Sequence, residues 1–141
     1  MIRKLSPDEL PLAKSLLENY KLPTDDLSSH NVLLFGYFST DEFLGCVGIE
    51  EYDDALLLRS LAVTKSKGTC GIGTMLAEYV GRYAFKHGKK TIYLLTDSAD
   101  GFFSRLGFKA CDRALAPSTI QQTRQCRELC AESAVLMSYE F

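Results

Sequence analysis

The feature that most constrains the fold is a glycine-rich segment, residues 61–74, between an apolar segment and a helical pattern. The preceding residues 55–60 are leucine-rich and too continuously apolar for a half-exposed strand, which predicts a buried strand. Apolar residues then recur at helical spacing from Met75 to Ala84, and Gly88 follows as a C-terminal stop. The sequence therefore predicts a core strand that passes through a short glycine-rich loop into the first turn of a helix.

The start of this helix has the properties of an anion-binding site. The first N–H groups of a helix have no acceptor within the helix, and the helix dipole adds positive charge there. Gly71 and Gly73 lack side chains, so an oxyanion can approach the backbone and unusual φ angles cost little. The alternative is a tight glycine turn without a ligand, since short glycine motifs also match by chance.

The composition is that of an ordinary globular domain. A chain of 141 residues, 46% hydrophobic and 24% charged, predicts one domain, residues 1–141, with a core of its own. The net charge of −2 argues against broad nucleic-acid binding, and no apolar segment is long enough to span a membrane. The N-terminus leads into a capped helix rather than resembling a signal peptide. The five cysteines are scattered without a C-x-x-C pair, which suits reduced thiols and a cytoplasmic location.

The order of the expected strands predicts an α/β (α+β) domain with a central mixed, mostly antiparallel sheet flanked by helices. A short first strand is expected at 2–5. Strands at 32–38, 43–50 and 56–63 are joined by short connections, which predicts an antiparallel meander. The strand at 91–95 follows a helical crossover and is therefore expected to lie parallel to 56–63.

Three further helices are expected, and the chain closes with a strand at 134–139. Ser6 and Glu9 form a capping box at the start of the first helix, which an irregular stretch at 23–26 follows. A short helix is closed by Gly107. The third helix begins at Pro117, and its apolar positions include Ile120, Cys126 and Leu129.

Two motifs in this order resemble the GNAT superfamily of acyl-CoA-dependent N-acetyltransferases. The first is Leu61-Ala62-Val63 followed by Gly71-x-Gly73 at the head of a helix, and the second is Ala99-x-x-Phe102-Phe103-x-x-x-Gly107-Phe108. The agreement in element order extends from the first helix to the last strand, which implies a GNAT-like single domain. Segments 57–63, 93–96 and 129–134 look like the GNAT branch often named arsenic-resistance N-acetyltransferases, a name that implies an operon context more than a substrate.

The resemblance implies acetyl-CoA as cosubstrate and no metal. Backbone groups of Leu61, Ala62 and Val63 are expected to pair with the pantetheine arm, as amides can extend a strand edge. The loop and helix start are expected to bind the CoA pyrophosphate, in agreement with the anion site derived above. The cosubstrate residues implied there are Gly68, Thr69, Cys70, Gly71, Ile72, Gly73 and Thr74, and the second motif adds Thr96 and Phe103.

This chain departs from the superfamily pattern at three of these positions. Gly68 stands where Gln or Arg is usual, and Thr96 stands where Asn is common. Phe103 falls where a Tyr often serves as general acid to the departing thiolate, so that role is vacant. A free thiol has a pKa near ~8.5, so its thiolate is a fair leaving group without full protonation. Ser104, Tyr93 and water are the candidate substitutes.

Two charged residues near the buried strand are candidates for the chemistry. Glu50 and Glu51 end the preceding strand on opposite faces, at a position where GNAT enzymes often place a base or a water-holding carboxylate. Glu50 is the favoured general base, as the carboxylate expected to face the pocket; a solvated strand end is the alternative. Arg59 lies in an apolar strand, where an unpaired charge is costly. It forms either a structural ion pair or a guanidinium fork that binds the carboxylate of an amino-acid-like substrate.

The expected function is transfer of an acetyl group from acetyl-CoA to the amine of a small molecule, by direct attack in a ternary complex. The alternatives are a non-catalytic acyl-CoA-binding sensor and an interaction domain on the same fold. A homodimer is expected by analogy alone. Cys126 and Cys130 lie four residues apart, a spacing that suits a metalloid site, but small buried hydrophobic residues are the favoured interpretation.

Overall fold

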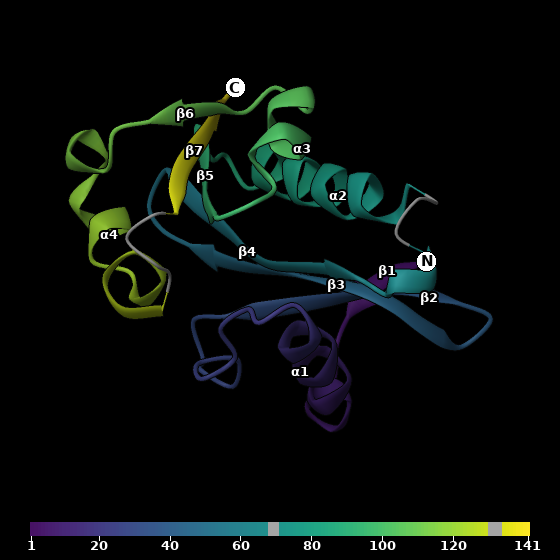
Figure 1. Cartoon of the computed structure of the whole chain (residues 1–141). Helices are drawn as coiled ribbons and strands as arrows, with labels where there is room; N and C mark the ends of the chain where they lie inside the picture. The colour runs from purple at the N-terminus through teal and green to yellow at the C-terminus, as the bar shows by residue number, and fades with distance from the viewer. Residues whose placement is uncertain (68–70, 130–133) are drawn as a thin grey trace. The chain divides into compact units, whose positions relative to one another are not determined.

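The computed structural model describes residues 1–67, 71–129 and 134–141. In these residues, strands β1 to β7 form one mixed sheet in the order β1-β2-β3-β4-β5-β7-β6 (Figure 1). The pair β4–β5 is parallel, whereas β1–β2, β2–β3, β5–β7 and β6–β7 are antiparallel. The predicted α/β (α+β) class, with a mixed and mostly antiparallel sheet flanked by helices, is confirmed. The chain divides into two compact units, which are described separately below. The first consists of Met1–Glu50 and Leu58–Tyr83, and the second of Glu51–Leu57 and Ala84–Phe141.

The first unit contains the strands that lead to the glycine loop. They are β1 (Ile2–Lys4), β2 (Leu33–Ser39), β3 (Glu42–Glu51) and β4 (Ala55–Val63), of which β3 and β4 continue into the second unit. Thr40 and Asp41 both have positive φ between β2 and β3. Positive φ at two successive residues is the geometry of a type I′ turn, whose twist matches a hairpin.

Helices of the first unit lie on both faces of its strands (Figure 1). A 3₁₀ turn (Pro7–Glu9) leads into α1 (Leu10–Asn19), and the predicted capping box at Ser6 and Glu9 is present. On the α1 face a buried cluster contains Leu5, Ala13, Leu16, Leu17, Leu27, Val32, Leu34, Phe38, Cys46 and Ala62. On the other face the ring of Phe35 lies 5.0 Å from that of Tyr79 in α2 (Ile72–Lys86). Both faces of these strands are therefore covered by apolar packing, and α2 ends as predicted before Gly88, which has φ of 71°.

The second unit contains the rest of the sheet. Its strands are β5 (Thr91–Thr96), β6 (Lys109–Cys111) and β7 (Val135–Glu140), and its helices are α3 (Asp100–Arg105) and α4 (Ser118–Gln121). The first residues of β4 pair with β5, from Ala55↔Thr91 to Leu57↔Tyr93, so the predicted parallel crossover is confirmed. A buried cluster is formed by Ala55, Leu57, Ala116, Ile120 and Leu136.

The helix expected from Pro117 through Leu129 is wrong as a continuous element. Helix α4 ends at Gln121, and a separate π-helical turn spans Gln125–Leu129. Between them the Thr123 hydroxyl donates to the Ile120 carbonyl at 2.8 Å and accepts from the Cys126 N–H at 3.2 Å. A side chain that bonds to nearby backbone in this way competes with the helical ladder, which explains the break.

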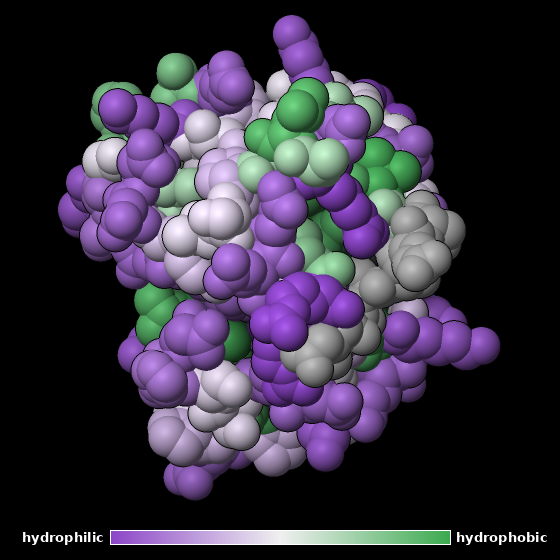
Figure 2. Space-filling model, turned by 90° about the vertical axis from the view of Figure 1, so that its left-hand side faces the viewer, coloured by the Kyte–Doolittle hydropathy of each residue, from purple (hydrophilic) through white to green (hydrophobic). Residues whose placement is uncertain are grey.

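The surface of the molecule is mixed in character. Figure 2 shows a face that is mainly hydrophilic, with its hydrophobic residues in small separate groups, as is usual for a folded globular chain. Of the helices in the described part of the chain, none is long and apolar enough to cross a membrane.

Candidate active site

The start of α2 has the geometry that the glycine pattern predicts. Gly71 has φ of 78°, a conformation that favours glycine, and a Cβ added there would meet no atom within 4 Å. Helix α2 begins at Ile72, and the Met75 N–H donates to the Gly71 carbonyl at 3.1 Å. The amides of Ile72, Gly73 and Thr74 therefore belong to the first turn, where helix geometry supplies no acceptor. Gly68, Thr69 and Cys70 lie outside the described residues.

Strand β4 is kinked just before the segment expected to pair with pantetheine. Ser60 has φ of 57°, which costs a non-glycine residue about 1–3 kcal/mol. Two neighbours hold it: the Arg59 Nε donates to the Ser60 Oγ at 3.1 Å, and the Cys46 Sγ donates to the Ser60 carbonyl at 3.4 Å. Burial raises the pKa of Cys46 to about 12, so its thiol stays protonated and able to donate. The kink is therefore supported by side chains from both β3 and β4.

Beyond the kink, Leu61 and Val63 direct their backbone groups away from β3. The Thr64 N–H donates to the Leu44 carbonyl at 2.9 Å, and a Cβ on Gly45 would lie 3.0 Å from the Ala62 carbonyl oxygen, so Thr64 and Ala62 face β3. Because backbone groups alternate along a strand, those of Leu61 and Val63 point to the opposite edge. This edge is the one at which an added extended chain can pair with β4.

Three charged side chains form a buried cluster in the first unit. Arg59, Asp26 and Glu50 are each 2–3% exposed. The Arg59 Nη1 donates to the Asp26 Oδ2 at 2.6 Å and to the Glu50 Oε2 at 2.7 Å, and its Nη2 donates to the Asp26 Oδ1 at 2.5 Å. Asn31 adds a longer contact of 3.4 Å from its Nδ2 to the Glu50 Oε1. The cluster links the segment between α1 and β2 to the end of β3 and the middle of β4.

The structural ion pair, one of the two alternatives predicted for Arg59, is present. Burial lowers the pKa of the guanidinium, but its hydrogen bonds to Asp26 and Glu50 raise it, and the net result is above the ordinary value. Both terminal nitrogens of the fork already donate to carboxylates of the protein. A substrate carboxylate would have to displace one of them, and this role stays a prediction.

Glu50 and Glu51 differ as expected from strand alternation. Glu50 is buried in the cluster, whereas Glu51 is exposed and its Oε1 lies 3.6 Å from the Lys89 Nζ. The Lys89 Nζ also donates to the Tyr52 carbonyl at 2.6 Å, so this lysine binds the backbone of the turn between β3 and β4. Asp26 was not predicted as a member of this cluster. A buried arginine indicates a carboxylate partner, but nothing in the sequence distinguishes Asp26 from its neighbour Asp25 in that role.

In the second unit, Thr96 and Phe103, the residues expected from the second motif, contact neighbours around α3. The Thr96 Oγ1 accepts from the Ala99 N–H at 2.9 Å, just before α3. Phe103 is 5% exposed, and its ring lies 5.0 Å from that of Phe102 and 5.6 Å from that of Phe108. An apolar ring thus occupies the position of the usual tyrosine. Of the candidate substitutes, Tyr93 has a pKa raised mainly by burial.

The cysteine pair suggested for a metalloid is only partly within the described residues. Cys126 packs with Cys111 against the apolar cluster of the second unit, as the hydrophobic interpretation expects. Cys130 lies outside the described residues. In the part of the chain that the structure describes, no group of three or more His, Cys, Asp and Glu side chains is placed to hold a metal ion.

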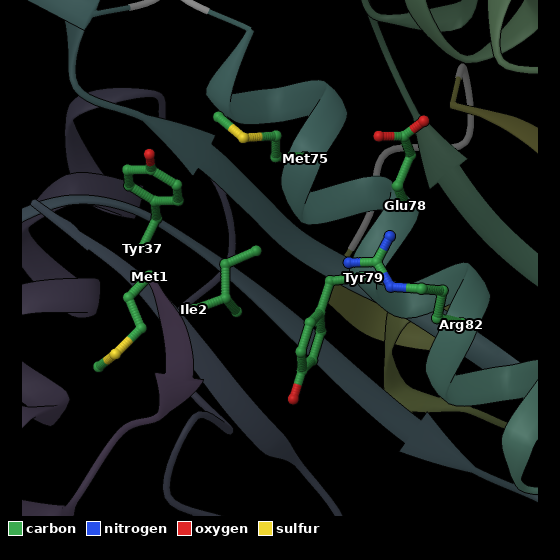
Figure 3. A pocket seen from close by; sticks show the side chains of 7 residues that line it. All are labelled: Met1, Ile2, Tyr37, Met75, Glu78, Tyr79 and Arg82. Atoms are coloured by element: carbon green, nitrogen blue, oxygen red, sulfur yellow. The ribbon is translucent and has the colours of Figure 1, made fainter.

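A groove on the α2 side of the first unit was not predicted (Figure 3). Its volume is about 420 Å³, and β1, β2 and α2 supply its walls. Tyr37 of β2 is part of this wall. The lining residues are Met1, Ile2, Tyr37, Met75, Glu78, Tyr79 and Arg82. They come from segments more than thirty residues apart, which is why no single motif indicates the groove.

Three solved structures illustrate the similarity in fold. N-acetylglutamate synthase from Neisseria gonorrhoeae, complexed with coenzyme A and L-arginine, has a TM-score of 0.84 at 17% identity, over 100% of this chain and 33% of that chain. Rv2747 from Mycobacterium tuberculosis, in complex with CoA, has a TM-score of 0.79 at 18% identity, over 100% and 99%. A GNAT-family acetyltransferase from Staphylococcus aureus has a TM-score of 0.80 at 20% identity, over 99% and 98%. At these identities the comparison establishes the fold, and this chain spans about a third of the gonococcal synthase.

Sequence comparison gives the family. No curated protein sequence matched this chain. The family model described as the acetyltransferase (GNAT) family matches residues 2–108, which include the whole segment from β1 through α3. Because that match covers most of the chain and agrees with the fold, the chain belongs to the acetyltransferase (GNAT) family.

Proposed function

We propose that this protein transfers an acetyl group from acetyl-CoA to the amine of a small, amino-acid-like molecule. The observation that carries the proposal is the junction of β4 and α2. A kinked strand there, with the backbone of Leu61 and Val63 directed to one edge, is followed by α2, which begins at Ile72. A strand edge followed by helix N-terminal amides suits a ligand that joins amide groups to a diphosphate.

The proposed cosubstrate site uses backbone groups more than side chains. Leu61 and Val63 would pair with the pantetheine arm through their backbone groups, whereas the backbone of Ala62, between them, faces β3. The segment from Gly68 to Thr74 would bind the pyrophosphate through its amides. Ile72 is 3% exposed, so its side chain anchors the helix start while its N–H belongs to the first turn. Thr96 and Phe103 complete the proposed residues.

Glu50 is the proposed general base. Attack by an amine on a thioester requires a neutral amine held close to the carbonyl, and a carboxylate can accept the proton directly or through water. The Arg59 Nη1 fixes the position of the Glu50 carboxylate at 2.7 Å. We therefore propose that Arg59 holds the base in place. Because Phe103 has no hydroxyl, the CoA thiolate would leave without protonation by a tyrosine general acid.

Release of free thiol during incubation of acetyl-CoA with a panel of amines tests this proposal. The wild type should release thiol with at least one amine. Glu50→Gln should lower kcat by about 100-fold or more, because general base catalysis is lost. Glu51→Gln, one residue along the same strand but exposed, is the matched control and should keep kcat within a few-fold.

Equal rates for the Glu50→Gln and Glu51→Gln variants would remove Glu50 from the mechanism. The apolar surroundings of Phe103 favour a second candidate, a non-catalytic acyl-CoA-binding sensor. The sensor predicts acetyl-CoA binding without thiol release for any amine, which separates it from the enzyme.

A further inference from the structure

Tyr20 connects the end of α1 to the end of β4. It follows the last residue of α1, and its hydroxyl donates to the Val63 carbonyl at 2.6 Å. The Lys65 Nζ lies 5.9 Å from the centre of the tyrosine ring, within the range of a cation–π contact. Tyr20 is nevertheless 40% exposed, so its phenol is held in place while a ligand can still reach it.

The accepting carbonyl fixes where the phenol lies. Val63 directs its backbone to the edge of β4 opposite β3, since its neighbour Thr64 is bonded to Leu44. The Tyr20 hydroxyl therefore lies at the edge where an extended chain would add to β4. Val63 is also the last residue of the strand, and Gly68 follows five positions later in the sequence. The phenol thus contacts the last residue of the proposed pantetheine-pairing segment.

We propose that Tyr20 is a further cosubstrate-binding residue, which contacts the pantetheine arm of acetyl-CoA; this inference rests on the proposed function. A tyrosine hydroxyl has one proton to donate and retains lone pairs that accept. Here the proton goes to Val63, so the phenol oxygen is left as an acceptor for an amide N–H of pantetheine. The phenol in this way extends the pairing edge of β4 outward by one acceptor.

The test compares ligands with and without the arm. Coenzyme A and adenosine 3′,5′-bisphosphate share the nucleotide, but only coenzyme A carries pantetheine. Tyr20→Phe keeps the ring and its contact with Lys65 and removes only the hydroxyl. One neutral hydrogen bond corresponds to about a fivefold change in affinity, so Tyr20→Phe should weaken coenzyme A binding by about fivefold and leave the bisphosphate unchanged. Titration calorimetry with each ligand provides the measurement.

Tyr37→Phe is the matched control, because it removes a tyrosine hydroxyl from the same unit at the groove on the α2 side. It should bind coenzyme A as the wild type does. Affinity that is unchanged or higher in Tyr20→Phe overturns the inference, as does an equal loss in Tyr37→Phe or an equal loss for both ligands. Failure of the wild type to bind coenzyme A at all would instead overturn the proposed function.

Discussion

At the scale of single residues, the most informative feature is a guanidinium that is shared between two buried carboxylates. The side chain of Arg59 is fully buried, and it pairs with Asp26 and Glu50, which lie 33 and 9 residues away in sequence. Burying charges costs several kcal/mol each, which only good geometry and further hydrogen bonds repay. Such a cluster adds little net stability, but its loss is costly, and it fixes the position of the Glu50 carboxylate.

Arg59→Leu should lower the free energy of unfolding by about 3–5 kcal/mol, because it leaves two carboxylates buried without their cation. Urea unfolding followed by circular dichroism measures this. Arg3→Leu is the control, since it removes an ion pair with Glu9 that is open to solvent and screened by salt. A loss in Arg59→Leu no larger than that in Arg3→Leu would show that the buried cluster does not hold the fold.

At the scale of elements, the starts and stops of helices could be predicted from the sequence, whereas contacts between distant residues could not. The capping box at Ser6 and the glycine stops at Gly88 and Gly107 were predicted, because each depends on residues a few positions apart. The break after α4 was missed, because apolar spacing does not reveal that Thr123 bonds to the backbone. The contact of Tyr20 with Val63 was likewise beyond prediction, since 43 residues separate the partners and only the folded sheet brings them together.

The capping box also carries a pH dependence. Hydrogen bonds from Arg3 and from the Ser6 backbone lower the pKa of Glu9 from 4.5 to about 2. A carboxylate with a lowered folded-state pKa stabilises the protein above its unfolded pKa, so this contribution is lost as the pH falls from about 4.5 to about 2. Glu9→Gln keeps a residue that suits a capping box but does not titrate. It should therefore show a smaller loss of urea-unfolding stability over that window than the wild type.

High salt should reduce the same difference, because the pair is exposed and screening weakens it. The prediction fails if wild type and Glu9→Gln lose stability in parallel as the pH is lowered, which would place the acid-sensitive group elsewhere in the chain.

At the scale of the whole molecule, sheet topology was predicted because few connections are allowed. Short links produce antiparallel neighbours, and the helix between β4 and β5 requires a parallel pair. The same topology places a helix start directly after β4, which is where the family membership and the proposed cosubstrate site coincide. Which side chains bind the acceptor amine does not follow from topology, since loops between the elements decide it.

The most direct test of the proposed cosubstrate site is the change in melting temperature that acetyl-CoA causes in the wild type and in two glycine variants of α2 and its start. Acetyl-CoA at 100 times its dissociation constant adds about 2.7 kcal/mol, which should raise the melting temperature of the wild type by several degrees. Gly71→Glu should abolish the shift, because its carboxylate would compete with the diphosphate at the helix start. Gly81→Glu, in the middle of the same helix with no atom within 4 Å of an added Cβ, should retain it. No shift in the wild type at millimolar acetyl-CoA, or equal shifts in all three proteins, would contradict the claim that the start of α2 binds the cosubstrate.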